Sequence, residues 1–347
     1  MSGRIAARAE DVLDRGPARL CRSACRRRRR RAYTEQIVAR GLAALAAAAA
    51  LAALALGAAA CEHRRRPPLA LGGHRFASDG VELAYHVAGA GPLCIVHPGG
   101  PGMEWSYLRM PELERRLMLV YLEPAGTGAS GALADPHGYT RARYAADIDA
   151  LRRALGLPRV CLIGHSAGGK AALAYALSYG EHLSRLVLYA TSAVTDAEWE
   201  RDSEAAVQAR AGEPWFPDAD AARRADIPPV PGDCPRFKRI APFYFADWTG
   251  RRAELAPFIA RFRCWPASRE GKPKPPDDLR PLLAGLRAPT LVATGRHDFL
   301  FPPKWGELTT AAIAGARHVI FERSGHFAHV EEPAAFAAAV GDFVAGP

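Results

Sequence analysis

The sequence predicts an α/β protein in which a mostly parallel, eight-stranded, doubly wound sheet carries an inserted helical cap. Three observations lead to this prediction. Short apolar runs of strand length alternate with longer helical patterns over most of the chain. Glycine-rich turns follow several of these runs, where strands end and helices begin. Within the stretch from about residue 74 to the end, the alternation fails between residues 192 and 287, which are rich in aromatic residues, proline and charge.

The elements follow one another in an order that fits this architecture. An opening hairpin is expected from runs at 75–78 and 81–87, joined by an Asp79-Gly80 turn. Parallel strands separated by helices are then expected at 93–97, 118–123, 159–163, 185–190, 289–294 and 317–322. The sheet domain therefore covers 74–191 and 288–347, and residues 192–287 are expected to form a helical cap.

A candidate nucleophile lies in the stretch LIGHSAGGKAAL, residues 162–173. An apolar strand runs into a glycine turn and then into a helix that is expected to end at Gly180. In this context G-x-S-x-G is the pattern of a nucleophile elbow, in which small residues let the strand and the helix approach closely. The elbow would expose the hydroxyl of Ser166 at the carboxyl edge of the sheet. A serine that only caps the helix is the alternative interpretation.

A serine hydroxyl needs a base and an acid to become a nucleophile. Asp298 follows the strand at 289–294, and His326 follows the strand at 317–322, so that Ser, Asp and His occur in this order at successive strand ends. His297 and His329 are the competing histidines. His326 is preferred because it follows the loop glycine, whereas His329 is expected at the start of the last helix.

The same chemistry needs donors for a developing oxyanion. The turn Pro98-Gly99-Gly100-Pro101-Gly102 follows the strand at 93–97 and exposes backbone amides without side chains in the way. We assign the oxyanion hole to the N–H groups of Gly100 and Ala167, with Gly99 as the alternative to Gly100. A rigid turn without a ligand is the competing interpretation.

These motifs resemble those of the α/β-hydrolase superfamily, and within it the proline-iminopeptidase-like branch, from about His74 to Val344. The resemblance rests on His97-Pro98-Gly99-Gly100-Pro101-Gly102, which is similar to the His-Gly-Gly-Pro-Gly turn of that branch. It implies an α/β-hydrolase fold with a cap. The elbow Gly164-His165-Ser166-Ala167-Gly168 is closer to general esterases and lipases than to the Gly-Gly-Ser-Trp-Gly of the peptidases.

Three functions follow as hypotheses. The first is a serine hydrolase that cleaves a small ester or amide through an acyl-enzyme intermediate. The second is an aminopeptidase of the proline-iminopeptidase type that acts on short peptides. The third is a catalytically silent binding protein on the same fold, against which the complete set of catalytic residues argues.

The cap is expected to choose the substrate, because pockets are commonly lined by aromatic side chains. The aromatic residues of the cap are the candidates for lining the pocket, and they favour a substrate with a hydrophobic acyl or aromatic group. These residues are Trp199, Trp215, Phe216, Phe237, Phe243, Tyr244, Phe245, Trp248, Phe258, Phe262 and Trp265. The resemblance to aminopeptidases implies that cap carboxylates bind a free amine. The candidates for that role are Glu198, Glu204, Glu213 and Asp247.

The net charge is confined to the N-terminal part. Residues 1–66 contain 15 of the 46 basic and 5 of the 36 acidic residues, and this segment accounts for the whole formal charge of +10. The remaining chain is balanced, so the basic composition does not predict nucleic-acid binding. The basic segment 1–40 is expected to be disordered.

Residues 41–61 form an uncharged stretch of 21 residues, GLAALAAAAALAALALGAAAC, with arginines on both sides. Its length matches the ~20 residues of a membrane-spanning helix. It is interpreted either as a transmembrane anchor or as a secretory signal whose end resembles a lipoprotein site at Cys61. In both cases the hydrolase domain is expected outside the cytoplasm, in the bacterial periplasm or on the cell surface, with a membrane as partner.

The cysteines carry a separate set of expectations. Cys94 and Cys161 lie in predicted core strands and are expected to be buried free thiols. Cys234 and Cys264 lie in the cap and are either a disulfide or two free thiols. No Cys/His spacing predicts a metal site and no phosphate-binding loop is present, so neither a metal nor a cofactor is expected.

Overall fold

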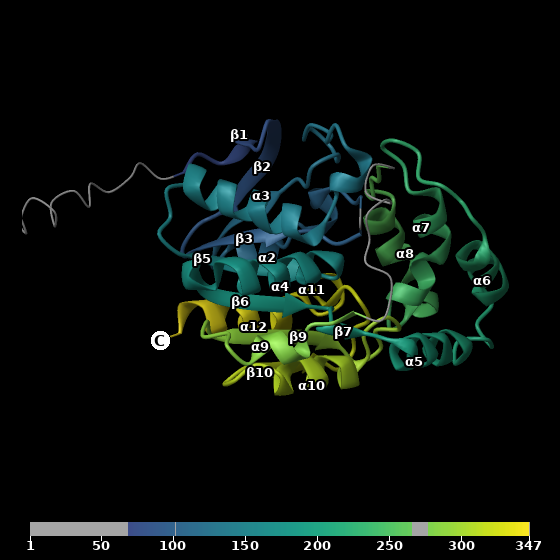
Figure 1. The fold of residues 1–347 in the computed structure, drawn as a ribbon. Coiled ribbons are helices and arrows are strands. Elements are labelled where there is room, and N and C mark those ends of the chain that lie inside the picture. The colour runs from purple at the N-terminus through teal and green to yellow at the C-terminus, as the bar shows by residue number, and fades with distance from the viewer. Residues whose placement is uncertain (1–68, 101, 266–276, 347) are drawn as a thin grey trace, which may run out of the picture. The chain divides into compact units, whose positions relative to one another are not determined.

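Eight strands form the central sheet of the protein, in the order β1-β2-β4-β3-β5-β6-β9-β10 (Figure 1). The structure is a computed structural model that describes residues 69–346 except residue 101 and residues 266–276. The strands are β1 (Gly72–Ser78), β2 (Val81–Gly89), β3 (Leu93–His97), β4 (Met118–Leu122), β5 (Val160–His165), β6 (Leu183–Tyr189), β9 (Thr290–Gly295) and β10 (Arg317–Phe321). The predicted eight-stranded, mostly parallel α/β fold is confirmed.

The sheet pairs as the sequence pattern requires. β1 and β2 are antiparallel, and the pairing of Ser78 with Val81 closes a two-residue turn at Asp79 and Gly80. Both turn residues have positive φ, 43° and 77°, as a tight hairpin turn demands. β2 pairs antiparallel with β4, and the strands that follow in the sheet, in the order β4-β3-β5-β6-β9-β10, are parallel. All six residues of β5 are buried, which agrees with helices covering both faces.

Two pairs of helices enclose the sheet. α3 packs against α4 on one face, and α12 packs against α2 on the other (Figure 1). The helices of this sheet domain are α2 (Pro111–Glu114), α3 (Arg141–Ala154), α4 (Ala167–Tyr179), α10 (Pro303–Ala311), α11 (Ala328–Glu331) and α12 (Pro333–Ala345). Short 3-10 helices occur at Trp105–Leu108, Pro136–Gly138 and Gly180–His182.

In the segment 192–287, which we call the cap, the helices between residues 197 and 259 lie beyond the carboxyl ends of the parallel strands, whereas the short helix at 280–283 lies beside β9 (Figure 1). The elements of the cap are α5 (Ala197–Gln208), α6 (Phe216–Arg224), α7 (Pro235–Ile240), α8 (Trp248–Ile259), α9 (Arg280–Leu283), β7 (Val194–Thr195), β8 (Asp277–Asp278) and a 3-10 helix at Ala241–Tyr244. The sequence predicts helices alone, whereas β7 and β8 pair as a small antiparallel sheet. This sheet joins the start of the cap to its end.

Aromatic side chains of the cap share the main core with the sheet domain. Phe237 stacks on Phe262 with ring centroids 4.3 Å apart, and Phe262 stacks on Tyr107 at 4.9 Å. Phe258 and Phe262 also contact Phe327, which follows the predicted catalytic histidine. Most of the cap aromatics therefore hold the cap on the sheet.

The structure corrects the prediction for Cys94 and Cys161. These residues were expected to be free thiols, but they form a disulfide. β3 and β5 are neighbours in the sheet, and Cys94 pairs directly with Cys161, so that their Cα atoms are 4.5 Å apart. The prediction was wrong because 67 residues separate the two cysteines in the sequence, and only strand order brings them together.

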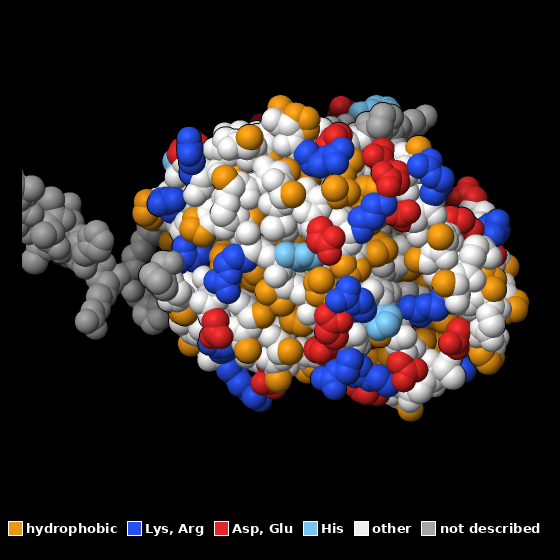
Figure 2. All heavy atoms as spheres, turned by 90° about the horizontal axis from the view of Figure 1, so that it is seen from below, with side chains coloured by type: hydrophobic (Ala, Val, Ile, Leu, Met, Phe, Trp, Pro, Cys, Tyr) orange, Lys and Arg blue, Asp and Glu red, His pale blue; other side chains and the backbone are white. Residues whose placement is uncertain are grey.

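The described surface carries both signs of charge. Figure 2 shows basic and acidic side chains interspersed on the face seen from below. Among the described residues, no helix is long and apolar enough to cross a membrane. The predicted segments 1–40 and 41–61, including Cys61, lie outside the described residues.

Candidate active site

Ser166 occupies a sharp corner between β5 and α4. Its φ of 54° and ψ of −119° are unusual for a residue other than glycine, and such strain persists where the surrounding structure enforces it. A Cβ on Gly168 would lie 2.4 Å from the carbonyl oxygens of His97 and Pro98, so only glycine fits there. The close approach of α4 to the end of β3 holds the corner, and Ser166 lines the pocket above it.

Asp298 and His326 are joined by a buried hydrogen bond. His326 Nδ1 is 2.7 Å from Asp298 Oδ2, and the residues are 2% and 1% exposed. The other carboxylate oxygen, Oδ1, accepts the N–H groups of Leu300 and Phe301 at 2.9 and 3.1 Å. Two backbone donors therefore orient the carboxylate, which fixes the proton on Nδ1 and leaves Nε2 of His326 as an acceptor.

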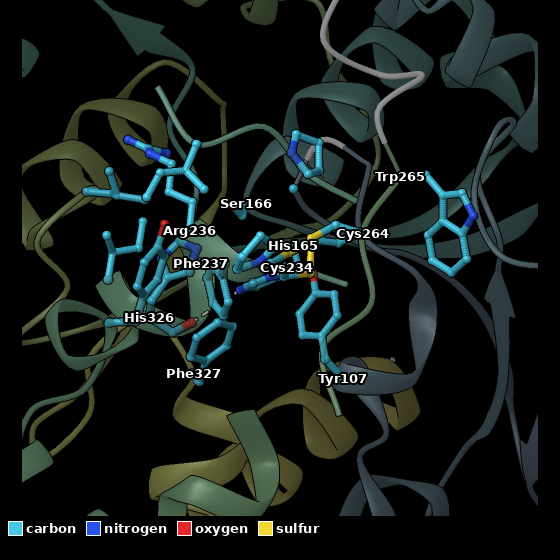
Figure 3. A pocket seen from close by; sticks show the side chains of 18 residues that line it. Tyr107, His165, Ser166, Cys234, Arg236, Phe237, Cys264, Trp265, His326 and Phe327 are labelled. Atoms are coloured by element: carbon cyan, nitrogen blue, oxygen red, sulfur yellow. Dashed lines mark hydrogen bonds between the residues drawn. A yellow bond between two sulfur atoms is a disulfide. The ribbon is translucent and has the colours of Figure 1, made fainter. Parts of the chain in front are cut away.

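Ser166 and His326 line the same pocket, from the ends of different strands (Figure 3). The part of the chain that the structure describes contains no hydrogen bond between their side chains. Such bonds are often long in unliganded enzymes and shorten when substrate binds. The arrangement brings the three predicted residues to one edge of the sheet.

The two competing histidines lie elsewhere. His297 is exposed, next to Asp298 in the chain. His329 is buried in α11, where Nδ1 is 3.0 Å from the hydroxyl of Tyr189 and Nε2 is 3.1 Å from the carbonyl oxygen of Tyr107. Burial lowers the pKa of His329 to about 4, so this imidazole is neutral.

The backbone donors near Ser166 differ in their availability. The N–H of Gly99 donates to the hydroxyl of Tyr107 at 2.6 Å, so this amide is already engaged. Gly100 lines the pocket, and Ala167 is the first residue of α4, where amides have no carbonyl partner within the helix. This geometry favours Gly100 over Gly99 as the partner of Ala167.

A chain of buried hydrogen bonds joins the glycine turn to the histidine loop. The Tyr107 hydroxyl, which accepts from Gly99, is 2.9 Å from His165 Nδ1, and His165 Nε2 is 3.2 Å from the carbonyl oxygen of His326. Burial lowers the pKa of His165 well below its ordinary value. The neutral ring therefore accepts from Tyr107 at Nδ1 and donates to His326 at Nε2.

Sequence reasoning did not single out Tyr107 or His165. His165 is the residue before the serine in G-x-S-x-G, and its position gives a signal for proximity to the site. Tyr107 belongs to no motif, and only the fold shows its contact with the turn.

Glu331 connects the histidine loop to the cap. Its Oε2 accepts the N–H of Gly325, and its Oε1 accepts the N–H of Ala246, both at 2.7 Å. Burial raises the pKa of this carboxyl to about 7. Because the N–H of His326 also donates to the carbonyl of Tyr244 at 2.7 Å, the loop that carries His326 is fixed to the cap at two places.

The pocket between the cap and the sheet edge has a volume of about 210 Å³. Most of its walls are apolar, and Phe237, Tyr244 and Trp265 are the predicted cap aromatics that reach it. The disulfide between Cys234 and Cys264 also lines it, and this resolves the alternative that the sequence left open. No described aspartate or glutamate lines the pocket.

The four cap carboxylates proposed for binding an amine have other partners. Glu198 pairs with Lys304, Glu204 with Arg223, Glu213 with the hydroxyl of Thr249, and Asp247 with the N–H of Gly250. None of these carboxylates is among the residues that line the pocket. Among the described residues, no group of His, Cys, Asp and Glu is arranged to hold a metal ion.

Comparisons with known proteins agree with the observed fold. Residues 92–333 match the family model described as the alpha/beta hydrolase fold. The chain is 30% identical over 287 residues to 2-hydroxymuconate semialdehyde hydrolase of Pseudomonas sp. strain CF600, covering 79% of this chain and 94% of the relative. It is 27% identical over 273 residues to proline iminopeptidase of Levilactobacillus brevis, covering 73% and 88%.

A solved structure gives the same result for the fold. The enol-lactonase from Burkholderia xenovorans LB400 matches with a TM-score of 0.59 and 26% identity. The match covers 79% of this chain and all of that one.

Proposed function

The chain belongs to the alpha/beta hydrolase family, and from this premise we propose that it is a serine hydrolase that cleaves a small ester or amide through an acyl-enzyme intermediate. The hydrolase activity follows from the family, whereas the serine mechanism and the substrate type are the proposal. The observation that carries it is the buried Asp298–His326 pair, whose histidine lines the same pocket as the strained Ser166.

In the first half of the proposed reaction, Ser166 Oγ attacks the carbonyl carbon of the substrate, and its proton passes to Nε2 of His326. Asp298 stabilises the imidazolium through Nδ1. The oxyanion accepts the N–H groups of Gly100 and Ala167. As the tetrahedral intermediate collapses, the bond to the alcohol or amine breaks, and the leaving group takes the proton from His326.

Deacylation repeats the same steps with water. His326 removes a proton from the water molecule, whose oxygen attacks the acyl carbon of the ester on Ser166. A second tetrahedral intermediate releases the carboxylic acid, and His326 returns the proton to Ser166 Oγ. One water molecule is consumed in each cycle, and Ser166 and His326 end the cycle in their starting protonation states.

An aminopeptidase is the second candidate, and the identity to the proline iminopeptidase favours it. Binding of a free ammonium group needs an acidic or carbonyl partner in the pocket. Since no described carboxylate lines the pocket, its composition supports ester hydrolysis more than aminopeptidase activity.

Labelling with a fluorophosphonate tests the serine mechanism directly. Wild-type protein should react covalently, and Ser166→Ala should not. Equal labelling of both, or labelling of neither, contradicts the proposal, and the second outcome favours a silent binding protein. A panel of p-nitrophenyl esters and prolyl and alanyl arylamides then distinguishes esterase from aminopeptidase.

We also propose that the hydrolase domain works outside the cytoplasm. Its support is the pair of disulfides, Cys94–Cys161 and Cys234–Cys264, because disulfides persist mainly in oxidising compartments. The uncharged segment 41–61 would then serve as the anchor or as the export signal. Intact mass and N-terminal sequencing of the native protein test this, and an unmodified chain in the cytosol contradicts it.

A further inference from the structure

Arg236 is, histidines aside, the one charged side chain among the described residues that line the pocket. We propose that its guanidinium binds an anionic group of the substrate, so that the preferred substrates are esters or amides that also carry a carboxylate. The inference rests on the proposed function, because it names the substrate class of that site. Figure 3 shows Arg236 and Ser166 lining the same pocket.

Three basic residues near Arg236 form ion pairs with carboxylates, whereas Arg236 forms none with the described residues. Each of three neighbours has a carboxylate partner: Arg223 with Asp220 at 2.8 Å, Lys238 with Asp233, and Arg239 with Asp218 at 2.5 Å. Among the described residues, Arg236 has no carboxylate partner. Its Nη2 donates to the carbonyl oxygen of Arg223 at 2.6 Å.

That single bond places the guanidinium and leaves most of its donors for a ligand. An arginine side chain has five N–H donors in a planar fork, which matches the two oxygens of a carboxylate. Arg236 is half-buried in the first turn of α7, directly before Phe237, which also lines the pocket. The backbone contact therefore orients a cation whose counter-ion is not supplied by the described residues.

The walls of the pocket strengthen the preference for an anion. Phe237, Ile240 and Leu300 are apolar, and the hydroxyl of Tyr244 is uncharged because burial raises its pKa. Charges interact more strongly beside apolar walls than in bulk water. A substrate carboxylate would compensate Arg236, whereas a free ammonium group would be repelled by it.

Matched ester pairs test the inference on the whole protein. In the first series, p-nitrophenyl half-esters of succinate, glutarate and adipate are compared with p-nitrophenyl butyrate, valerate and hexanoate. In the second, the carboxylate is on the leaving group, with carboxy-nitrophenyl butyrate compared with p-nitrophenyl butyrate. The two series cover a carboxylate on either side of the scissile bond and at several distances from Ser166.

We expect wild-type protein to hydrolyse at least one carboxylate ester with a higher kcat/KM than the neutral partner of that ester. Arg236→Met should lower the ratio of these two kcat/KM values by about tenfold or more. Comparing each ester between the two proteins removes differences in intrinsic reactivity. Arg236→Lys keeps the charge without the planar fork and should retain part of the preference.

Arg239→Met is the matched control, because Arg239 belongs to the same helix, is exposed and does not line the pocket. In Arg239→Met, the ratio of kcat/KM for the carboxylate ester to kcat/KM for the neutral ester should equal that of wild type. Fluorophosphonate labelling checks that each variant is folded, and Arg236→Lys decides the result if Arg236→Met fails this check.

The outcomes separate the two proposals. Hydrolysis of neutral esters with no preference for any carboxylate ester overturns the anion site and leaves the proposed function intact. A preference for the carboxylate ester that survives in Arg236→Met also overturns the anion site. If Arg236→Met fails the labelling check, the same conclusion follows when Arg236→Lys keeps the full wild-type preference. Absence of both ester hydrolysis and fluorophosphonate labelling overturns the proposed function instead.

Discussion

The sheet domain and the cap of this protein bury their side chains to different degrees. In α4, which carries Ser166 at its start, eight of the thirteen residues are buried. In α5 of the cap, Val207 is the one buried residue among twelve. The sheet domain holds its polar site residues with buried hydrogen bonds. The cap helices α5, α6 and α7 instead form ion pairs at the surface.

This difference separates the two tasks of the site. Chemistry needs groups held within a few tenths of an ångström, and the buried Asp298–His326 pair and the Tyr107–His165 bonds provide that order. Substrate choice needs a pocket wall whose side chains can be replaced without disturbing the catalytic groups. The cap provides such a wall with Arg236 and Phe237, and it remains attached through aromatic packing and Glu331.

The largest effect is expected from a change in the sheet domain. Asp298→Asn should lower kcat by about 10⁴-fold, because an amide at this position no longer fixes the tautomer of His326 or stabilises its cation. Asp218→Asn, at an exposed ion pair of the cap, should stay within about twofold of wild type. Steady-state kinetics on one neutral ester measures both. Similar losses in the two variants would contradict the division of tasks.

A smaller effect is expected from the cap disulfide, which closes a loop of 30 residues. Cys234→Ala combined with Cys264→Ala should lower the free energy of unfolding by about 3 to 4 kcal/mol. Urea unfolding of the oxidised wild type and the double variant measures the difference. A loss below about 1 kcal/mol would show that cap packing alone already holds this segment.

The smallest effect concerns pH and the residue that joins the two regions. The pKa of Glu331 is raised from 4.5 to about 7, so its stabilising contribution is complete below pH 4.5 and is lost as the pH rises through 7. Between these values, wild type should lose roughly 2 to 3 kcal/mol of unfolding free energy relative to Glu331→Gln. Denaturation at a series of pH values measures it.

The comparison of wild type with Glu331→Gln also provides the control for this pH experiment. Asp298 and Arg251 face Glu331, and both are present in the two proteins, so the difference between the curves reports the replacement of the Glu331 carboxyl. Parallel stability curves for wild type and Glu331→Gln would contradict the assignment of this pH dependence to Glu331.

The order of elements in the sheet domain could be predicted from sequence because each buried strand is a short apolar run bounded by glycine or a charged turn. The predicted runs at 93–97 and 317–322 correspond to β3 (Leu93–His97) and β10 (Arg317–Phe321). In the cap the local signal was weaker, since aromatic residues and prolines do not indicate which side chains face the pocket. The two-residue strands β7 and β8 are too short to leave a periodic pattern.

The sequence by itself determined the α/β fold and placed Ser166, Asp298 and His326 at strand ends, because apolar periodicity and glycine turns are local properties of the chain. Tertiary structure alone decided the Cys94–Cys161 pairing, the engagement of Gly99 by Tyr107 and the exposure of Arg236 to the pocket. Each of these depends on which distant segments become neighbours. Strand order and cap packing set those contacts, and neither is written in the spacing of residues along the chain.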